Sequence, residues 1–491
     1  MRIDGVRPAI ASFAFAAILA ACTIGPDYKR PPVSPPDLYR SQAPGTETSS
    51  LADLPWWQAF GDTTLQELIQ EAIAANYDLR IAAARVQQAR AQAGIARAAY
   101  FPSIGYTGKV QRSKEFEAFL GINPDQIDNN GNNLFLGALS ASWEIDVWGA
   151  IRRSNEAAIA KLMATEEGQR AVLLSLVSEV AQNYFQLIEL DTRLDISKKT
   201  TAAYQGIYKI FSDRLEFGVV SQVQTSRAEG SWASAAATIP EVETQIAAKE
   251  NQISTLLGRN PGPIPRGTPL FAQAVVPTVP AGLPSALLER RPDLLKAEQQ
   301  VRAANAQIGV AKADFLPKLS LTGLVGKASP ELSAITAGSS TIWAIAAGLT
   351  GPIFQGGKIY FNYKATQAAW EQTRLSYEQA VIQAFQEVAS NLDALDKLAK
   401  AEAEQARAVA ALEKSVQLAT DRYLYGFSSY YEVLEAEERL FSAQNAQVSI
   451  RLNRLLAYVQ LYKALGGGWN VADPTAPPPP AQRAACDARS C

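Results

Sequence analysis

The sequence predicts a mixed α and β fold, in which long helical hairpins are joined to four membrane-spanning β-strands. Three observations support this class. Residues 76–108 align without a gap with residues 291–323, so the chain is an internal duplication. Two long stretches lack proline, and two pairs of short segments alternate between apolar and polar residues. Each copy of such a repeat is expected to form one structural unit that stacks against the other.

The duplication extends over most of the chain. Asp78 aligns with Asp293 near the start of the two copies. Further along, the segment DRLEFG that ends at Gly218 aligns with DRYLYG, which ends at Gly426. We therefore expect a first structural repeat at 67–258, an equatorial linker at 259–283 and a second repeat at 284–466.

The N-terminus predicts a lipoprotein signal peptide at residues 1–21. Arg2 and Arg7 precede an apolar run, and Leu-Ala-Ala-Cys ending at Cys22 resembles the bacterial lipobox. This motif predicts a covalent lipid, palmitate included, on Cys22 and no other cofactor. The alternative is an ordinary signal peptide with an accidental cysteine. Thr23 after the cysteine favours the outer membrane.

Residues 22–66 are expected to form an N-terminal lipid anchor and an extended linker, because the stretch is rich in proline and serine. Residues 467–491 are expected to be a disordered tail, since they contain four consecutive prolines and no hydrophobic periodicity. Cys486 and Cys491 lie in this tail. They either pair in an oxidising periplasm or have no structural role.

Each repeat is expected to contain one very long helix, at 149–216 and at 357–424. These stretches contain no proline and are rich in Ala, Leu, Gln, Glu and Arg. Each helix would be about 100 Å long, which favours a coiled-coil or helical-barrel architecture. A shorter helix follows each turn, and another helix of roughly 34 residues precedes Pro102 or Pro317. Pro240 is expected to kink the shorter helix of the first repeat.

Two strand hairpins are expected, at 103–148 and at 318–356. Apolar or small residues alternate with polar ones, and aromatic residues mark both ends of the return strands. Strands of about ten residues with one apolar face fit a transmembrane β-barrel, with a soluble antiparallel sheet as the alternative. The first hairpin has the longer polar tip, at 116–132, which we expect at the cell exterior.

Four strands from one chain cannot cross a bilayer as an open sheet, because the hydrogen-bonding groups of the edge strands would be unsatisfied. Bacterial outer-membrane barrels have at least eight strands, so one or more further sets must be contributed by other chains. Three copies would supply twelve strands. The sequence therefore predicts an oligomer.

The composition argues against several classes of protein. The chain has 491 residues, with 46 basic and 48 acidic residues, and no basic stripe of the kind that binds nucleic acid. Histidine is absent, and the cysteines have no zinc-ligand spacing, so no metal site is expected. No nucleophile elbow, phosphate-binding glycine loop or metalloprotease motif is present. We therefore expect a protein that is not an enzyme.

Several segments, taken together, resemble the TolC-like outer-membrane factors of tripartite efflux pumps, in the lipoprotein branch of the OprM and NodT type. The segments are CTIGPDYKRP at 22–31, WWQAFGDTTLQELIQEAIAANYDL at 56–79, WEIDVWG at 143–149, PIFQGGK at 352–358 and LYKALGGGW at 461–469. The resemblance covers nearly the whole mature chain, and the order and spacing of the segments make it specific.

This resemblance implies a homotrimeric duct, with a shared 12-stranded barrel in the Gram-negative outer membrane and a helical barrel across the periplasm. It implies three partners: a periplasmic adaptor (membrane fusion) protein, an inner-membrane transporter of the resistance-nodulation-division type and outer-membrane lipid. It also implies export of drugs, antibiotics among them, or other small molecules. The alternatives are a duct for type I protein secretion and a non-channel periplasmic lipoprotein scaffold.

In the family, the two helical turns dock the adaptor. A glycine is expected at each turn, because a helix reversal commonly needs a residue at positive φ. The resemblance places the docking contact at Arg214, Gly218, Val219, Val220 and Ser221 of the first turn and at Arg422, Gly426, Phe427, Ser428 and Ser429 of the second.

The resemblance also implies a periplasmic gate made of Tyr423, Glu432 and Glu435. The two glutamates lie three residues apart and share one helix face, so a trimer would gather six carboxylates. Such a ring would favour cations. Gln224 stands where a family member has an aspartate, and Ser428 stands where it has an arginine. We therefore expect packing and other hydrogen bonds, rather than those ionic links, to hold the gate closed.

Overall fold

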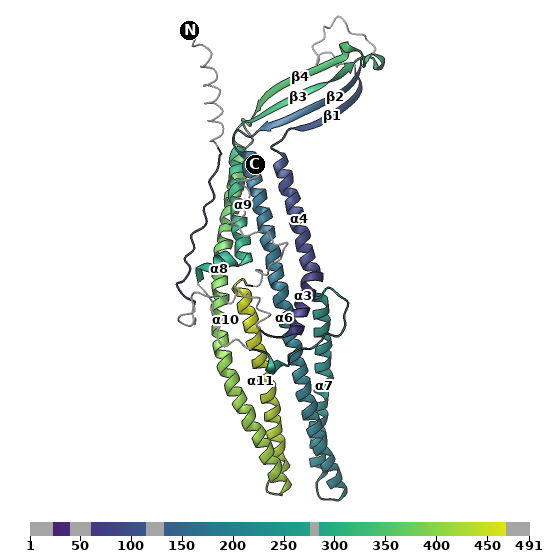
Figure 1. The fold of residues 1–491 in the computed structure, drawn as a ribbon, viewed down its shortest axis with the longest axis vertical. Coiled ribbons are helices and arrows are strands. Elements are labelled where there is room, and N and C mark those ends of the chain that lie inside the picture. Colours follow the sequence, from purple (N-terminus) through teal and green to yellow (C-terminus); the bar gives the residue numbers. More distant parts are fainter. Residues whose placement is uncertain (1–22, 40–59, 114–131, 275–283, 468–491) are drawn as a thin grey trace. The chain divides into compact units, whose positions relative to one another are not determined.

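Helices make up most of the computed structural model, which describes residues 23–39, 60–113, 132–274 and 284–467 (Figure 1). The signal peptide and Cys22 lie outside the described residues. So do Cys486 and Cys491 and most of the polar tip expected at 116–132.

The helices of the two repeats have equal lengths. The long helices α6 (Ala150–Glu216) and α10 (Lys358–Leu424) each contain 67 residues. The helices that follow the turns, α7 (Gln222–Leu256) and α11 (Tyr430–Ala464), each contain 35 residues. The helices before the strands, α4 (Tyr77–Ala98) and α9 (Pro292–Ala313), each contain 22 residues. The predicted duplication is therefore confirmed.

The prediction of one helix before each strand hairpin is wrong. A separate short helix precedes both α4 and α9. These are α3 (Thr63–Ala75) and α8 (Pro284–Arg290). In the first repeat Asn76 interrupts the helix and its Oδ1 accepts a hydrogen bond from the Leu79 amide at 3.0 Å. In the second repeat Pro292 begins α9, and a proline at the first helical position favours a helix start there.

Pro240 lies inside α7, and the helix runs through it without interruption. A proline ring cannot donate the backbone hydrogen bond of a helix, so one carbonyl of the preceding turn loses its usual partner. The aligned residue in α11 is Val448, which is buried.

The four strands form one antiparallel sheet in the order β1-β2-β3-β4. The strands are β1 (Ser103–Ser113), β2 (Asn132–Ile145), β3 (Lys318–Ser329) and β4 (Thr341–Thr350). Between β3 and β4 lie the short 3-10 helices η4 (Leu332–Ala334) and η5 (Gly338–Ser340). The two predicted hairpins are therefore present, and the pairing of β2 with β3 joins them into one sheet (Figure 1).

The chain divides into two units. The first consists of Met1–Pro31, Val86–Thr165 and Ala297–Tyr377, and it contains the sheet. The second consists of Pro32–Arg85, Glu166–Lys296 and Glu378–Cys491, and it contains both helical turns. Each unit therefore draws on both repeats, so each contains aligned positions that can be compared directly.

A buried carboxylate organises part of the second unit. Asp62, which precedes α3, is 1% exposed. Its oxygens accept hydrogen bonds from the amides of Leu65 and Thr268, from the Tyr184 hydroxyl and from the Gln273 side chain. A buried carboxylate needs such partners because desolvation is costly. Asp62 thereby fixes α3 and the segment around η3 (Leu270–Ala272) to α6.

Among the described helices, α6 contains one stretch that is long and apolar enough to cross a membrane by composition. More than half of that stretch, 56%, is buried inside the protein. The core helix of a protein outside a membrane has the same property, so the stretch is weak evidence for a membrane span.

Candidate functional site

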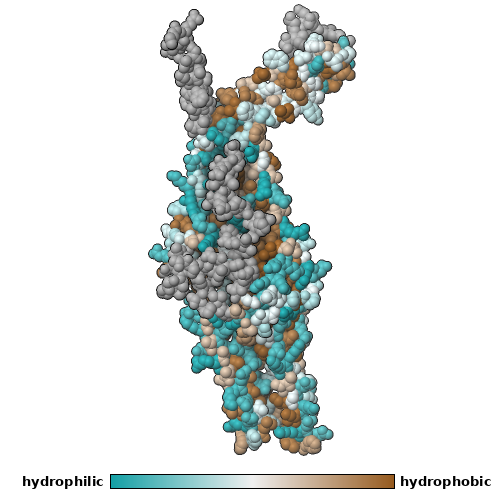
Figure 2. Space-filling view, in the orientation of Figure 1, coloured by the Kyte–Doolittle hydropathy of each residue, from teal (hydrophilic) through white to brown (hydrophobic). Residues whose placement is uncertain are grey.

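One face of the sheet is apolar and exposed. The strand register places the side chains of Ile104, Ala141, Gly323 and Ile345 on this face in one row across all four strands. Tyr106 is 88% exposed and Ile345 is 81% exposed. Brown side chains are spread over the strands in Figure 2. Exposed large apolar side chains of this face are Ile104, Tyr106, Val110, Leu139, Trp143, Val325, Trp343, Ile345 and Leu349.

The opposite face carries mainly small and polar residues, together with Leu136, Leu324 and Ile342. Ser103, Ser142 and Thr322 follow one another across three strands. At the helix end of the sheet, Lys318 Nζ lies 3.5 Å from Glu144 Oε1 on the same face. An apolar face outside and a polar face inside is the pattern of a membrane-spanning barrel wall.

Indole side chains hold the helix end of the sheet. Trp143 Nε1 donates to the Tyr100 carbonyl at 3.0 Å, and Trp148 Nε1 donates to the Pro317 carbonyl at 2.7 Å. Trp343 lies near the loop end of β4 and is 74% exposed. Amphipathic rings favour the two membrane-water interfaces, so this distribution fits a wall about one bilayer thick.

Residues 23–31 form an extended strap in the first unit. The Ile24 amide donates to the Trp148 carbonyl at 3.1 Å, and Asn305 Nδ2 donates to the Pro26 carbonyl at 2.9 Å. The buried Arg153 side chain pairs with Asp27 at 2.8 Å. Thr23 lies so close to Gly149 that a Cβ on this glycine would be 2.7 Å from the Thr23 Cγ2. The strap therefore begins at the junction of β2 and α6.

The two helical turns of the second unit have the same backbone. Gly218 (φ 69°) and Gly426 (φ 81°) both occupy the left-handed region. The Val219 amide donates to the Arg214 carbonyl at 2.9 Å, and the Phe427 amide donates to the Arg422 carbonyl at 2.8 Å. This is the Schellman type of helix end, and both glycines have the positive φ that was expected at the reversal.

An aromatic cluster lies near these turns and joins α6, α10 and α11. The rings of Phe211 and Tyr430 meet edge to face, with centroids 4.7 Å apart. Tyr423 lies 6.0 Å from Phe211 and 5.7 Å from Tyr430. Buried members of this aromatic cluster are Phe211, Ala228, Ala419, Tyr430, Val433 and Ala436, with Val220 among the residues packed against them.

Arg214 and Tyr423 form a direct link between the two helical hairpins. Arg214 Nη1, near the end of α6, donates to the Tyr423 hydroxyl at 2.9 Å. The guanidinium also lies 5.6 Å from the centroid of the Tyr423 ring, a cation-π distance. Arg214 was predicted at the docking contact, and its side chain contacts Tyr423, which was predicted to belong to the gate.

Both predicted gate carboxylates have a cationic partner in their own chain. Glu432 lies 3.7 Å from Arg422, and Glu435 lies 2.6 Å from Arg439. Gln224, aligned with Glu432, accepts a hydrogen bond from the Ser221 amide at 3.0 Å and caps α7. The two aligned side chains therefore act differently, one in an ion pair and one in a helix cap.

The remaining predicted docking residues differ in exposure. Val219 and Phe427 are exposed, whereas Val220 packs against the aromatic cluster. Ser429 precedes α11 as its N-cap residue, and the Ser428 hydroxyl is buried. Large apolar side chains that the prediction did not include are also exposed around the turns: Phe217, Val223, Leu424, Tyr425 and Tyr431.

The prediction missed Phe211, Tyr430 and Arg439. Phe211 aligns with Ala419, so the alignment of the repeats gave no sign that both positions belong to one cluster. The spacing of Glu435 and Arg439 by four residues on a helix was a usable signal for their ion pair.

Glu437 is a further acidic side chain of α11, beside the aromatic cluster. Burial raises the pKa of its carboxyl. Burial raises the pKa of the phenols of Tyr430 and of Tyr204 in α6, and the nearby Glu437 carboxyl raises both pKa values further. The residue of α7 that aligns with Glu437 is Glu229, and its side chain is exposed.

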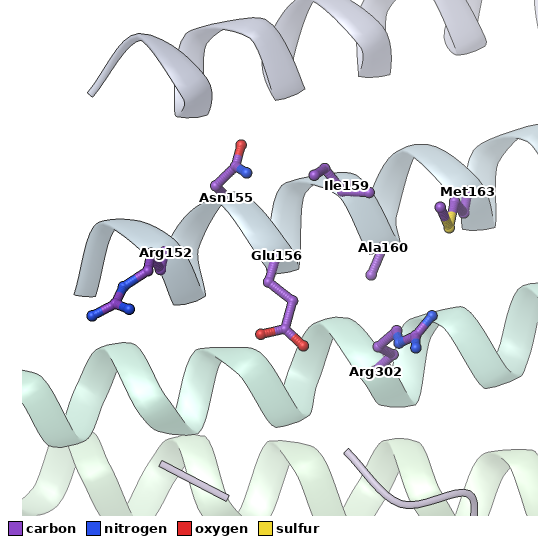
Figure 3. Close-up of a pocket in the computed structure, with 7 residues that line it drawn as sticks. All are labelled: Arg152, Asn155, Glu156, Ile159, Ala160, Met163 and Arg302. Atoms are coloured by element: carbon purple, nitrogen blue, oxygen red, sulfur yellow. The ribbon is translucent and has the colours of Figure 1, made fainter. Parts of the chain in front are cut away.

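An open groove in the first unit runs between α6 and α9 (Figure 3). Glu156 points from α6 toward the helix that carries Arg302. Glu156 is already paired with Arg153 at 2.8 Å, and Arg302 lies over the Tyr28 ring. Arg152, the remaining charged residue of the groove, lies 3.4 Å from Asp146. Each charged side chain that lines the groove therefore already has a partner.

Comparisons with known proteins agree on the kind of chain. The family described as "Outer membrane efflux protein" matches residues 68–259 and 283–467. The chain is 33% identical over 460 residues to the "Cation efflux system protein CusC" of Escherichia coli, which covers 93% of this chain and 98% of that protein. It is also 33% identical over 462 residues to the "Toluene efflux pump outer membrane protein TtgC" of Pseudomonas putida, covering 92% and 94%.

A solved structure agrees with the fold. The Campylobacter jejuni CmeC outer membrane channel aligns with a TM-score of 0.85 at 26% identity, over 92% of this chain and 96% of that one.

Proposed function

The chain belongs to the outer membrane efflux protein family, and we propose that it is the exit duct of a tripartite pump that exports drugs or other small molecules. Members of this family are channels of the outer membrane and not enzymes. The proposal concerns the assembly, the lipid, the gate, the partners and the cargo of this particular chain.

The observation that carries the proposal is the two-faced sheet. Its apolar face, with Tyr106, Leu139, Val325 and Trp343 in a row, matches the lipid side of a barrel wall. Its polar face suits a water-filled interior. A wall of four strands has two free edges, which supports a homotrimer that closes a barrel of about twelve strands.

The strap supports a lipid on Cys22. Thr23, the residue that follows Cys22 in the sequence, lies against Gly149 at the helix end of the sheet. A lipid there would enter the membrane leaflet that faces the periplasm. One acyl chain binds a bilayer reversibly, and the barrel would supply the second membrane element. Replacing Cys22 with Ser should abolish palmitate labelling, and continued labelling would exclude Cys22 as the anchor.

The helical turns support a gate and a docking surface in the periplasm. Tyr423 is linked to Arg214 and to the aromatic cluster, so we assign the closed state to this packing. Exposed Val219 and Phe427 offer apolar contact to a periplasmic adaptor, which would connect the duct to an inner-membrane transporter of the resistance-nodulation-division type.

Glu432 and Glu435 would line the entrance in this proposal. Because each carboxylate is paired with an arginine, the double replacement by Ala should lower cation selectivity by a modest factor, on the order of two, rather than abolish it. Reversal potentials of single channels in a salt gradient measure this. Unchanged selectivity would remove both residues from the constriction.

The relatives named above, together with an antibiotic efflux protein of Pseudomonas putida, are described for cations, toluene and antibiotics, and these cargoes differ in size and charge. The residues of the polar sheet face, which would line the duct, include small side chains that can form hydrogen bonds, such as Ser142 and Thr322. A wall of this kind discriminates little among solutes. We therefore assign the choice of cargo to the transporter.

Reconstitution tests the duct directly. Trimers extracted from outer membranes and inserted into planar bilayers should give single-channel conductance, with more frequent opening when the Arg214–Tyr423 link is removed. Export should be restored to a strain that lacks its own duct only when a matching adaptor and transporter are present. Absence of conductance from all preparations, including variants that lack the Arg214–Tyr423 hydrogen bond, would contradict the proposal of a channel.

A further inference from the structure

A second groove of the first unit lies between α6, α9 and α10 and has a volume of about 550 Å³. Its apolar lining consists of Ala303 and Ala304 of α9 and Ala369 of α10, and its other lining residues are polar or charged. A small apolar surface with a few converging polar groups is the usual composition of a site for a small organic molecule. We call it the Lys161 groove, after the residue of α6 that lines it.

Four nitrogen-bearing side chains of the Lys161 groove have free donors. Lys161 is exposed, and Gln300, Gln307 and Gln372 carry side-chain amides. None of these four side chains forms a hydrogen bond or an ion pair with another residue in the part of the chain that the structure describes. An ammonium group has three N–H donors, and each amide has two. The groove therefore offers hydrogen-bond donors and a positive charge that the protein itself does not use.

The hydroxyl groups of the groove are available only as acceptors. Thr366, Thr373 and Ser376 lie on α10, and each donates its hydroxyl hydrogen to the carbonyl four residues earlier, at 2.9, 2.7 and 2.9 Å. A hydroxyl oxygen that has donated its hydrogen keeps lone pairs for a further donor. This side of the groove therefore complements hydroxyl or amino groups of a ligand, while Lys161 complements a negative charge.

The charge of Lys161 is not compensated within the groove. None of the described residues that line it is acidic. Two carboxylates flank the lining residues in sequence, and both have partners: Glu298 of α9 pairs with Arg30 at 2.9 Å, and Glu371 of α10 pairs with Arg374 at 2.6 Å. The groove therefore keeps a positive charge that attracts an anionic ligand.

The Lys161 groove and the strap lie on opposite sides of α9. The strap contacts one stripe of this helix, where the Tyr28 hydroxyl donates to Glu298 at 3.1 Å and Asn305 donates to the strap backbone at 2.9 Å. Gln300 and Gln307 of the groove follow Glu298 and Asn305 by two residues. Two residues correspond to a rotation of about 200° around a helix. The groove therefore opens on the face of α9 that the strap does not cover.

This face of α9 is directed to the interior of the proposed duct. The strap follows Cys22 in the sequence, and a lipid on Cys22 would lie in the membrane, outside the barrel wall. The strap thus marks the outer surface of the first unit. The Lys161 groove, on the opposite side, would be reached from the water-filled channel.

We propose that the Lys161 groove binds organic carboxylates as they pass through the duct. The carboxylate accepts hydrogen bonds from the Lys161 ammonium and from a glutamine amide, and the apolar body of the molecule lies against the three alanines. Ala369 aligns with Lys161 in the duplication, so each chain supplies one such cation and a trimer supplies three. This inference rests on the proposed function and deepens it, because it names one chemical class of cargo that the wall holds.

Equilibrium dialysis tests the site on purified trimers that conduct in planar bilayers. The probes are 2-naphthoate, an aromatic carboxylate, and 2-naphthamide, which has the same rings but no charge. Lys161→Gln removes the charge from an exposed position and introduces another good helix former. We expect this variant to bind 2-naphthoate about tenfold more weakly, the loss of one hydrogen bond to a charged group, and to bind 2-naphthamide as the native chain does.

Lys312→Gln is the matched control. Lys312 is an exposed lysine of α9, and it lies three residues after Gly309, on the side of the helix that contacts the strap. The substitution makes the same change in charge outside the groove, so the binding of both probes should stay unchanged. Ala369→Leu is a second variant, which fills the groove and keeps Lys161. It should weaken the binding of both probes.

Conducting trimers in which Lys161→Gln binds 2-naphthoate as tightly as the native chain would overturn the site and leave the proposed duct intact. Equal losses in Lys161→Gln and Lys312→Gln would also overturn it, since they would indicate a general attraction to positive charge. If Lys161→Gln weakened the binding of both probes equally, the carboxylate would not be the recognised group. Unchanged binding in Ala369→Leu would place the probe outside the groove. Absence of trimers and of conductance in the unmodified chain would instead contradict the proposed function itself.

Discussion

In the first repeat Asn76 separates α3 from α4, and in the second repeat Arg291 stands at the aligned break between α8 and α9. Asn76 Nδ2 donates to the Leu256 carbonyl at 2.9 Å, and Arg291 Nη1 donates to the Ala464 carbonyl at 3.0 Å. These two carbonyls are themselves aligned. The backbone contact is therefore duplicated, while the side chain that makes it has changed from a neutral amide to a cation.

Arg291 makes further contacts that Asn76 cannot make. It pairs with Asp293 at 2.6 Å and with Glu387 at 2.7 Å. Burial raises the pKa of Asp293, but hydrogen bonds from Arg291 outweigh this effect and hold that pKa below its usual value. The second repeat thus adds an ion-pair network to a contact that the first repeat makes with one amide.

The turns differ in the same way. Phe211 of the first repeat fills the aromatic cluster, and its aligned residue Ala419 leaves room for it. Gln224 caps its own helix, whereas Glu432 pairs with Arg422. One duplicated backbone therefore tolerates complementary side chains at aligned positions, and the two repeats are not interchangeable.

The largest effect is expected from Phe211→Ala. Phe211 is 1% exposed, and removing a buried ring should lower the free energy of unfolding by about 3 kcal/mol. Chaotrope unfolding of the purified protein measures this. Phe217→Ala, at an exposed ring near the same turn, is the control and should change stability by less than about 0.5 kcal/mol. Equal effects would show that the aromatic cluster does not depend on the first repeat.

Arg291→Ala should come next, at about 2 kcal/mol, because Asp293 and Glu387 are half-exposed and water replaces part of the lost contact. Asn76→Ala should cost about 1 kcal/mol. Arg291→Asn, which introduces the residue of the first repeat, should lie between the two. The same unfolding assay ranks the three variants.

The Arg291 network also predicts a dependence on pH. Because the pKa of Asp293 is lowered in the folded state, its contribution is present above the unfolded pKa and is lost as the pH falls through the folded pKa. The difference in the free energy of unfolding between the native chain and Arg291→Ala should therefore become smaller at acidic pH. A difference that does not change with pH would contradict the role given to this ion pair.

Tyr423→Phe removes the hydroxyl that links the two repeats and keeps the ring. The loss of one partly exposed hydrogen bond should cost about 1 kcal/mol and raise the open probability of single channels several-fold. Tyr425→Phe changes an exposed hydroxyl near the same turn and serves as the control. The same open probability in both variants would show that the hydrogen bond between Arg214 and Tyr423 does not stabilise the closed state.

Thr225→Val should give a change of the opposite sign, a small stabilisation. Thr225 is 5% exposed and its hydroxyl is buried without a hydrogen-bond partner, while the aligned residue of the second repeat is Val433. Replacing an unsatisfied hydroxyl with a methyl group should raise the free energy of unfolding by about 1 kcal/mol. Thr225→Ser keeps the hydroxyl and should not stabilise. A destabilised valine variant would mean that the hydroxyl is satisfied.

The local patterns of the sequence were sufficient to predict the long helices, the strands with their two faces, and the glycine turns. Alternation and proline spacing determine these features over a few residues. The breaks at Asn76 and Arg291 were missed, although Pro292 was a visible signal for a helix start. The prediction of an acidic gate did not include the ion pairs of Glu432 and Glu435. The pair of Glu432 with Arg422 joins two helices.

The aromatic cluster and the strap could not be predicted in this way. Phe211, Tyr423 and Tyr430 meet only because α6, α10 and α11 pack together, and no single helix shows that pattern. Contacts of this kind depend on tertiary packing, which the periodicity of one segment does not encode.

The strap rests on two glycines that approach each other very closely. A Cβ at Gly25, where φ is 122°, would lie 2.6 Å from the Gly309 Cα, and a Cβ at Gly309 would lie 2.8 Å from the Ile24 carbonyl oxygen. A substitution that adds a side chain at either glycine alone would displace the strap from α9. The second substitution would then add little, so the two positions should show strong epistasis, with a double mutant about as defective as each single mutant.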